Sequence, residues 1–217
     1  MSNTLVHKLG IRVERFIYRH TLGLAPDPET WPVPHDAGSL PLPSVIEKLG
    51  ESRRGIMLDK EFSDRWPHRR TIVGAHAYRF EGNGEYDCGW RLVNLAGRFI
   101  TSDSDSPHDI LVTVPPVPVY RPISVLDWSG ERLARELNCT FRPDLIGVSA
   151  PLADHADRLR KLPVPWGDLY RLDRPESVYG KRVLLCDWRW EKGKSMTAIS
   201  KLLRHAGAEV VCFAWME

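Results

Sequence analysis

Apolar residues in the second half of the chain form short continuous runs, and segments with helical spacing of apolar positions separate several of them. The apolar runs lie at 110–114, 145–148, 183–186 and 210–215. Continuous apolar runs of this length are typical of strands buried on both faces of a sheet. Strands that alternate with helices predict an α/β fold with a mainly parallel twisted sheet and right-handed crossovers. We expect all four strands to lie in one sheet.

Two segments between these runs predict crossover helices. The first, 124–137, opens with Ser124 and Asp127 at the spacing of a capping box. The second, 195–206, places its apolar residues on one side and ends at Gly207, a residue that suits a helix C-cap. Both helices are expected to pack against the sheet through their apolar faces.

The start of the chain has a different character. Residues 5–22 have apolar positions at near-helical spacing with basic residues between them, which predicts an amphipathic helix. Its basic face is either a solvated outer surface or a surface for a partner or nucleic acid. Residues 25–43 are rich in proline, which excludes a helix or a central strand and predicts an extended connector. Ser44 and Glu47 then form a capping box that predicts a short helix to about residue 54.

The middle of the chain suggests a domain boundary. Residues 71–80 are a candidate strand, and residues 90–100 are a candidate helix. The acidic, serine-rich segment 101–109 predicts a loop. We therefore divide the chain into an α+β extension, residues 1–105, and a C-terminal α/β domain, residues 106–217.

Composition narrows the function little. The 217 residues include 30 Lys and Arg against 28 Asp and Glu, a formal charge of +2, which neither requires nor excludes a nucleic-acid partner. No apolar run reaches the ~18–20 residues that cross a bilayer, and the N-terminus lacks the pattern of a signal peptide. We expect a cytoplasmic protein without membrane contact. The 4 cysteines are widely spaced and show no metal-ligand pattern.

The segment 187–194 (DWRWEKGK) is the candidate ligand-binding loop, because ligands of doubly wound sheets bind at the carboxyl ends of the strands. Gly193 permits close approach of the backbone, and Ser195 adds a hydroxyl. Lys192 and Lys194 add positive charge. These features predict an anion-binding turn at a helix N-terminus, with an ordinary charged surface loop as the alternative.

The same loop lacks a residue that a P-loop needs, and it contains a cluster of aromatic and basic residues. Gly193–Ser195 reads GKS, but a P-loop needs a further glycine at the position of Trp188. Trp188 and Trp190 flank Arg189, and the chain has 8 tryptophans in all. Such an aromatic and basic cluster either fills and closes a pocket or stacks on a base or an exposed nucleic-acid strand.

Two blocks of sequence resemble a known family. Residues 183–216 (VLLCDWRWEKGKSMTAISKLLRHAGAEVVCFAWM) resemble the phosphoribosyl pyrophosphate signature of type I phosphoribosyltransferases. Residues 112–137 (VTVPPVPVYRPISVLDWSGERLAREL) resemble the first strand, the pyrophosphate loop and the following helix of the ComF-like branch, which is also appended to some RecQ-type DNA helicases. The blocks occur in the family's order. Finding the four predicted strands antiparallel, or in separate sheets, would end the argument for this resemblance.

The resemblance assigns roles to individual residues. Asp187 matches the first acidic residue, which faces the ribose hydroxyls in the family and is our candidate catalytic residue. Trp188 stands where the second acid is expected, Gly193 keeps the turn glycine, and Ser195 replaces threonine. The implied ligand-binding residues are Pro115, Pro116, Arg121, Asp187, Trp188, Arg189, Glu191, Lys192, Gly193, Lys194 and Ser195. The family's flexible loop should fall between about residues 149 and 170, where no match is evident.

The departures from the signature favour a degenerate site. Trp188 removes a hydrogen-bond acceptor for the ribose diol and puts a bulky ring in its place. Glu191 adds negative charge where a phosphate would sit, although Lys192 and Lys194 would offset it. Our leading hypothesis is a catalytically degenerate phosphoribosyltransferase-like protein that binds a nucleotide, a sugar phosphate or a partner.

Two other hypotheses stay open. One is an active phosphoribosyltransferase that uses phosphoribosyl pyrophosphate and Mg²⁺, the metal being held mainly through the ligand. The other is a pure protein–protein adaptor. The helicase association within the family suggests DNA processing or defence as a setting, with a helicase or nuclease as the partner, and this rests on analogy alone.

Overall fold

The structure is a computed structural model that describes residues 45–46, 55–59, 72–103, 107–115, 125–149, 166–190 and 193–216. The strands are β1 (Val45–Ile46), β2 (Gly55–Asp59), β3 (Ile110–Thr113), β4 (Thr140–Phe141), β5 (Ile146–Val148), β6 (Tyr170–Leu172), β7 (Arg182–Arg189) and β8 (Glu209–Met216). The α-helices are α2 (Ile72–Asn83), α3 (Tyr86–Asp103), α4 (Val125–Glu136) and α7 (Lys194–His205). The 3₁₀ turns among the described residues are η3 (Pro143–Leu145), η4 (Trp166–Leu169) and η5 (Pro175–Val178). The predictions for 5–22 and 25–43 lie outside the described residues.

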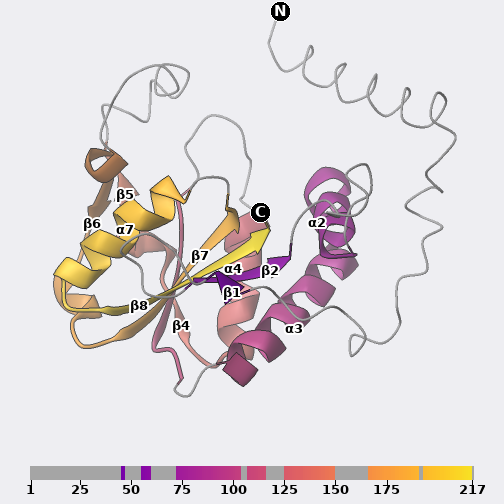
Figure 1. Ribbon diagram of the computed structural model, residues 1–217, viewed down its shortest axis with the longest axis horizontal. Coiled ribbons are helices and arrows are strands. Elements are labelled where there is room, and N and C mark those ends of the chain that lie inside the picture. The colour runs from indigo at the N-terminus through magenta and orange to yellow at the C-terminus, as the bar shows by residue number, and fades with distance from the viewer. Residues whose placement is uncertain are drawn as a thin grey trace, which may run out of the picture.

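A six-stranded sheet in the order β1-β2-β8-β7-β3-β4 forms the centre of the molecule (Figure 1). The pairs β2–β8, β8–β7, β7–β3 and β3–β4 are parallel, and β1 pairs with β2 in the antiparallel sense. The predicted α/β fold with a mainly parallel sheet is therefore confirmed.

The central strands form where the apolar runs predicted them. All four residues of β3 are buried, and Val183–Cys186 of β7 are 0% exposed. In β8, every residue after Glu209 is buried. Such strands have no solvated face, so their sequence is continuously apolar rather than alternating. The strand predictions at 110–114, 183–186 and 210–215 are confirmed.

The fourth predicted strand does not join this sheet. Residues Ile146–Val148 form β5, which pairs antiparallel with β6 in a separate two-stranded sheet. The preceding Leu145 belongs to the 3₁₀ turn η3, which leaves a strand of only three residues. The expectation of one sheet is wrong for this segment, and the result counts against the resemblance at this point.

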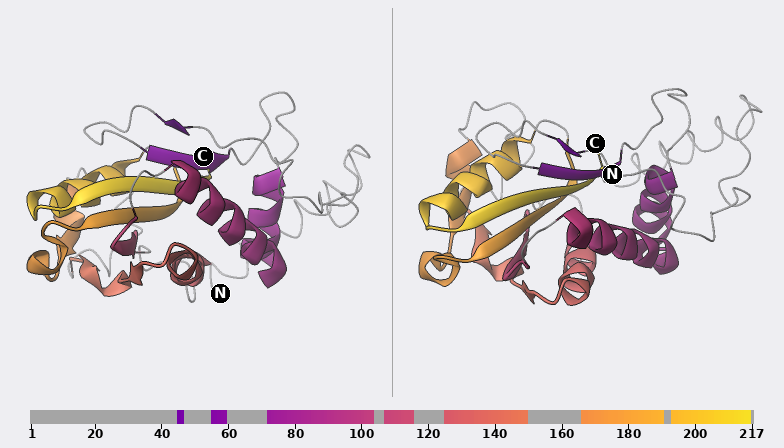
Figure 2. Two further views of the ribbon diagram at one scale, coloured as in Figure 1. Left: turned by 90° about the horizontal axis from the view of Figure 1, so that it is seen from below. Right: turned by 60° about the horizontal axis from the view of Figure 1, so that its bottom comes forward.

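The two predicted crossover helices are confirmed as α4 and α7. Helix α4 leads from β3 outward to β4, whereas α7 leads from β7 in the opposite direction to β8. Because parallel crossovers are right-handed, two crossovers that diverge from neighbouring strands must cover opposite faces of the sheet. Figure 2 shows α7 on one face and α4 on the other. The neighbours β3 and β7 thus flank a topological switch point.

Helices α2 and α3 extend the layer of α4. Residues 71–80 were expected to form a strand, but Ile72–Asn83 is helical and buries Val73, Ala77 and Phe80 at helical spacing. The candidate helix at 90–100 is confirmed as part of α3, which begins earlier and ends later. The capping-box prediction is wrong at Val45–Ile46, which form an edge strand.

The parts of the chain before and after residue 105 share one core. Strand β2 pairs with β8 along the sheet, and α3 contacts α4. A Cβ atom placed on Gly97 of α3 would lie 3.3 Å from Cβ of Glu136, so these two helices approach closely. The proposed division at residue 105 stays a prediction.

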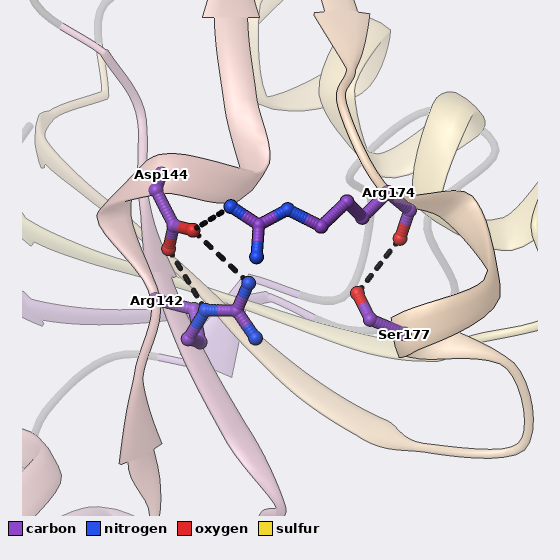
Figure 3. Close-up of polar contacts among 4 residues, drawn as sticks. All are labelled: Arg142, Asp144, Arg174 and Ser177. Carbon is purple, nitrogen blue, oxygen red and sulfur yellow. Dashed lines mark hydrogen bonds and ion pairs between the residues drawn. The ribbon is translucent and has the colours of Figure 1, made fainter.

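An ion-pair group links the edge of the main sheet to the chain beyond the small sheet (Figure 3). Nε of Arg142 donates to Oδ1 of Asp144 at 2.8 Å, and Nη2 of Arg174 donates to Oδ2 at 3.0 Å. The Arg142 hydrogen bond is the main cause that lowers the pKa of Asp144. Oγ of Ser177 donates to the carbonyl of Arg174 at 2.7 Å. Since these groups are exposed, we assign them an orienting role and little stability.

Candidate functional site at the β7–α7 turn

The candidate site lies where β7 ends and α7 begins, next to the end of β3. Open α/β sheets bind ligands outside the carboxyl ends of their strands at the topological switch point, which here falls between β3 and β7. The segment 187–194 was predicted to be a loop. In the structure, β7 continues through Arg189, so Asp187, Trp188 and Arg189 belong to the strand. The connection to α7 is therefore shorter than predicted.

Asp187 faces the side of the sheet that carries α7. Its half-buried carboxylate is one of the charges that raise the pKa of Tyr170, after the larger effect of burial. The Tyr170 hydroxyl donates to Oγ of Ser195 at 3.1 Å. Strand β7, strand β6 and helix α7 each contribute one polar side chain to this place.

Tyr170 is the residue that sequence reasoning missed. It lies 25 positions before Ser195, in the segment where the family's flexible loop was sought without success. Its side chain is 4% exposed, so the phenol is held as a buried wall beside Asp187 and Ser195. The sequence signal for a strand here is weak, since only Tyr170 and Leu172 stand two positions apart on either side of the polar Arg171.

The turn itself is built around Gly193. This residue has φ +61° and is the N-cap of α7, and its carbonyl accepts a hydrogen bond from the amide of Thr197 at 2.8 Å. No side chain caps the first turn of α7 among the described residues. The first amides of a helix and its dipole stabilise an anion, so this end of α7 can hold a phosphate.

The ring of Trp190 lies against Gly193. A Cβ atom placed on Gly193 would lie 2.1 Å from Cζ2 of that ring, so only glycine fits here. The amide of Trp190 donates to the carbonyl of Met216 at 2.7 Å, which holds the backbone of Trp190 at the end of β8. Trp190 is thus the aromatic residue that closes the turn.

Trp188 lies on the opposite face of the sheet. Its side chain is 3% exposed, and its ring centroid is 6.0 Å from that of Phe80 and 5.7 Å from that of Trp215. Nε1 donates to Oε2 of Glu81 at 3.0 Å. The expectation that Trp188 places its ring in the ligand position is wrong, because neighbouring residues of a strand point to opposite faces. For the same reason Trp188 is no stacking platform.

The other predicted site residues are dispersed or lie outside the described residues. Arg189 forms an ion pair with Glu81 at 3.5 Å, and Lys194 is exposed at the first position of α7. Pro115 is half-buried just after β3. The remaining four, all outside the described residues, are Pro116, Arg121, Glu191 and Lys192.

Asp127 also joins α4 to the sheet, whereas Ser124, the other residue of the predicted capping box, lies outside the described residues. Oδ1 of Asp127 accepts a hydrogen bond from Oγ1 of Thr113 at 2.8 Å, which joins α4 to the end of β3. The helix lies very close to the strand here, because a Cβ atom on Gly130 would be 2.8 Å from Cγ2 of Thr113. The packing of α4 against β3 therefore fixes the end of the strand that lies next to the candidate site.

A resident metal ion has no ligand set in the part of the chain that the structure describes. No group of three or more His, Cys, Asp or Glu side chains comes together there. Asp187 alone fits Mg²⁺ only if the ligand's own oxygens supply most of the coordination. The described helices also include none that is long and apolar enough to cross a membrane.

The chain is similar in structure to a phosphoribosyltransferase. A hypoxanthine phosphoribosyltransferase from Staphylococcus aureus matches with a TM-score of 0.38 and 14% identity over 58% of this chain and 61% of that one. A protein described as the allosteric regulatory enzyme of purine biosynthesis matches with a TM-score of 0.38 and 16% identity over 67% of this chain and 26% of that one. The chain therefore spans less than two thirds of the length of either.

Comparisons at the level of sequence add nothing to this picture, since no protein-family model and no curated protein matches the chain. With TM-scores this low, the fold and the site rest on the strands, helices and contacts described above.

Proposed function

We propose that this chain is a phosphoribosyltransferase-like protein that binds a sugar phosphate or nucleotide at the β7–α7 turn and has lost catalysis. The observation that carries the proposal is the position of Asp187, Gly193 and Ser195 at the switch point of a parallel sheet. That place would present a carboxylate to ribose hydroxyls and the amides of a helix N-terminus to a phosphate. Within the family, the motifs favour the ComF-like branch.

The loss of catalysis is inferred from the number of carboxylates at the end of β7. The family signature has two acids in succession, whereas here Asp187 is followed by a tryptophan whose side chain lies in the core. The carboxylate of Asp187 can accept a hydrogen bond from one ribose hydroxyl, but the second carboxylate of the signature is missing. The ring of Trp190 also narrows the room beside Gly193. Both features favour binding over turnover.

Calorimetry with phosphoribosyl pyrophosphate and Mg²⁺ tests this proposal on the full chain. We expect binding without release of pyrophosphate when nucleobases are added. Asp187→Asn and Ser195→Ala should each weaken binding about tenfold, which corresponds to a hydrogen bond to a charged ligand. Lys201→Ala, an exposed change farther along α7, serves as the matched control and should have no effect.

Three results would lead elsewhere. Pyrophosphate release that depends on Asp187 would favour the active phosphoribosyltransferase. The absence of saturable binding by any sugar phosphate would overturn the proposal, and loss of a helicase or nuclease complex on changing Ser195 would then favour the adaptor. A DNA-processing or defence setting rests on the resemblance of the motifs alone, and capture of such a partner by the wild type and not by Ser195→Ala would support it.

A further inference from the structure

A cavity of about 380 Å³ lies at the α2–α3 corner, in the helical layer on the face of the sheet opposite to α7. The described residues of its lining come from the middle of α2, the turn between α2 and α3, and the first turns of α3. They are His76, Arg79, Glu85, Tyr86, Asp87, Cys88 and Arg91. This volume is at the lower end of the range for small-molecule sites. None of these residues belongs to the β7–α7 turn.

His76 is a buried polar group without a partner at this cavity. The residue is 7% exposed, and its Nδ1 has no hydrogen-bond partner in the described part of the chain. Burial, followed by the charges of Arg91 and Arg79, lowers the pKa of His76 to about 4, so the imidazole is neutral at pH 7. A buried unpaired nitrogen is unfavourable, and a ligand atom would relieve that cost.

The cavity's lining has two arginines, Arg79 and Arg91, and two carboxylates, Glu85 and Asp87. Arg79 is matched by Glu85, because its Nε donates to Oε2 at 2.7 Å. Asn83 donates to the other oxygen of Glu85 at 2.9 Å, which leaves that carboxylate satisfied. The side chain of Arg91 forms no ion pair or hydrogen bond with any residue that the structure describes, yet its charge acts on both His76 and Cys88.

An aromatic ring borders the same cavity. Tyr86 is 58% exposed, and its inner edge packs against Phe80 and Trp128 with ring centroids 5.8 Å and 5.4 Å away. The ring is thus held in place while much of its surface stays open to solvent. A ring of this kind favours a planar aromatic partner, in an offset or edge-to-face arrangement.

We propose that the cavity between α2 and α3 binds a small planar aromatic or heteroaromatic carboxylate, with the carboxylate on Arg91 and the ring against Tyr86. A guanidinium fork matches a planar carboxylate with two parallel hydrogen bonds. A monoanion suits the site better than a phosphate dianion, because Glu85 and Asp87 carry negative charge at the same cavity. The imidazole of His76 provides a neutral polar contact on the inner wall.

Four probes separate charge from shape in one experiment on the full chain. Benzoate carries both features, benzamide lacks the charge, cyclohexanecarboxylate lacks the planar ring, and inorganic phosphate carries charge alone. Titrations at pH 7 and constant ionic strength are followed by the ring resonances of His76, identified with His76→Gln. We expect benzoate to bind saturably in the millimolar range, at least about fivefold more tightly than each other probe.

Matched variants test the named residues. Arg91→Met should weaken benzoate binding about tenfold, whereas Arg98→Met, an exposed arginine farther along α3, should leave it unchanged. Tyr86→Leu should abolish the preference for benzoate over cyclohexanecarboxylate. If Arg91→Met does not fold, Arg91→Lys takes its place, because lysine keeps the positive charge but lacks the planar guanidinium fork. Arg91→Lys should weaken benzoate binding at least about threefold, which is about half the loss in binding free energy expected for Arg91→Met.

The proposal fails if benzoate shows no saturable binding up to tens of millimolar, or if benzamide or phosphate binds as tightly as benzoate. It also fails if Arg91→Met and Arg98→Met have the same affinity for benzoate. The readout is independent of phosphoribosyl pyrophosphate binding. Failure of one site therefore leaves the test of the other intact.

Discussion

Replacement of Trp188 by aspartate would restore the second acid of the signature in the sequence, but the structure predicts that it destabilises the protein. The sequence alone predicts that Trp188→Asp combined with Glu191→Thr restores ligand binding with only a small change in stability. Trp188 is 3% exposed and packs between Phe80 and Trp215. The new carboxylate would enter this aromatic core instead of the ligand site.

The magnitude follows from three losses at one position. Removing a buried aromatic ring costs about 3–5 kcal/mol of unfolding free energy in typical cores. The hydrogen bond from Nε1 to Glu81 is also lost, and Glu81 then faces a second carboxylate across the same space. We expect Trp188→Asp to lower the free energy of unfolding by at least ~4 kcal/mol, a large part of the ~5–15 kcal/mol of an ordinary domain.

Urea denaturation followed by far-ultraviolet circular dichroism measures this loss without relying on tryptophan fluorescence. Trp188→Phe is the control, because it keeps an aromatic ring in the cluster and removes the hydrogen bond to Glu81. We expect it to cost about 1–2 kcal/mol. A loss below about 1 kcal/mol for Trp188→Asp, or a gain in phosphoribosyl pyrophosphate binding, would refute the assignment of Trp188 to the core.

Two further sets of variants test the turn and the buried histidines. Gly193→Ala should lose about 1–2 kcal/mol more stability than Gly84→Ala, because both glycines have positive φ but only Gly193 has the ring of Trp190 in the way; equal losses in thermal melts would exclude that contact. His108 is 5% exposed, and burial followed by the charge of Arg182 lowers its pKa to about 4. In the folded state the buried histidine therefore stays neutral, whereas in the unfolded chain it takes up a proton below about pH 6.5. The free energy of unfolding should therefore fall as the pH drops from about 6.5 to 4, by no more than ~3 kcal/mol per histidine. His108→Gln should remove its share of this slope in urea titrations at several pH values, and an unchanged slope would place the cause elsewhere.

The fold was predictable wherever burial acts on a continuous stretch of chain. The apolar runs of β3, β7 and β8 reflect strands that are covered on both faces, and the helical spacing of α7 reflects its single buried face. The prediction failed for β5, where three residues pair antiparallel with a segment more than twenty positions away. It also failed for α2, because β-branched residues at its start resemble a strand until the helical spacing of Val73, Ala77 and Phe80 is seen.

The candidate site was predictable in its residues but not in their directions. Asp187, Gly193 and Ser195 lie at the switch point because the order of strand, turn and helix places them there. The side of the sheet to which Trp188 points depends on whether β7 ends before or after it, and a shift of one residue exchanges the two faces. Tyr170 could not be predicted, since its contact with Ser195 depends on the position of β6 in three dimensions.

The burial of Trp188 gives a structural reason for a tryptophan directly after Asp187. Glu81 of α2 accepts a hydrogen bond from Nε1 of Trp188 and forms an ion pair with Arg189, so one helical carboxylate contacts two successive residues at the end of β7. The position that carries an acid in the signature thus serves here to attach α2 to the sheet. An acid at this position would lose that attachment and repel Glu81. Trp188 and the helical layer over this face of the sheet are therefore one structural feature, and placing a second acid after Asp187 would require changes in α2 as well as in β7.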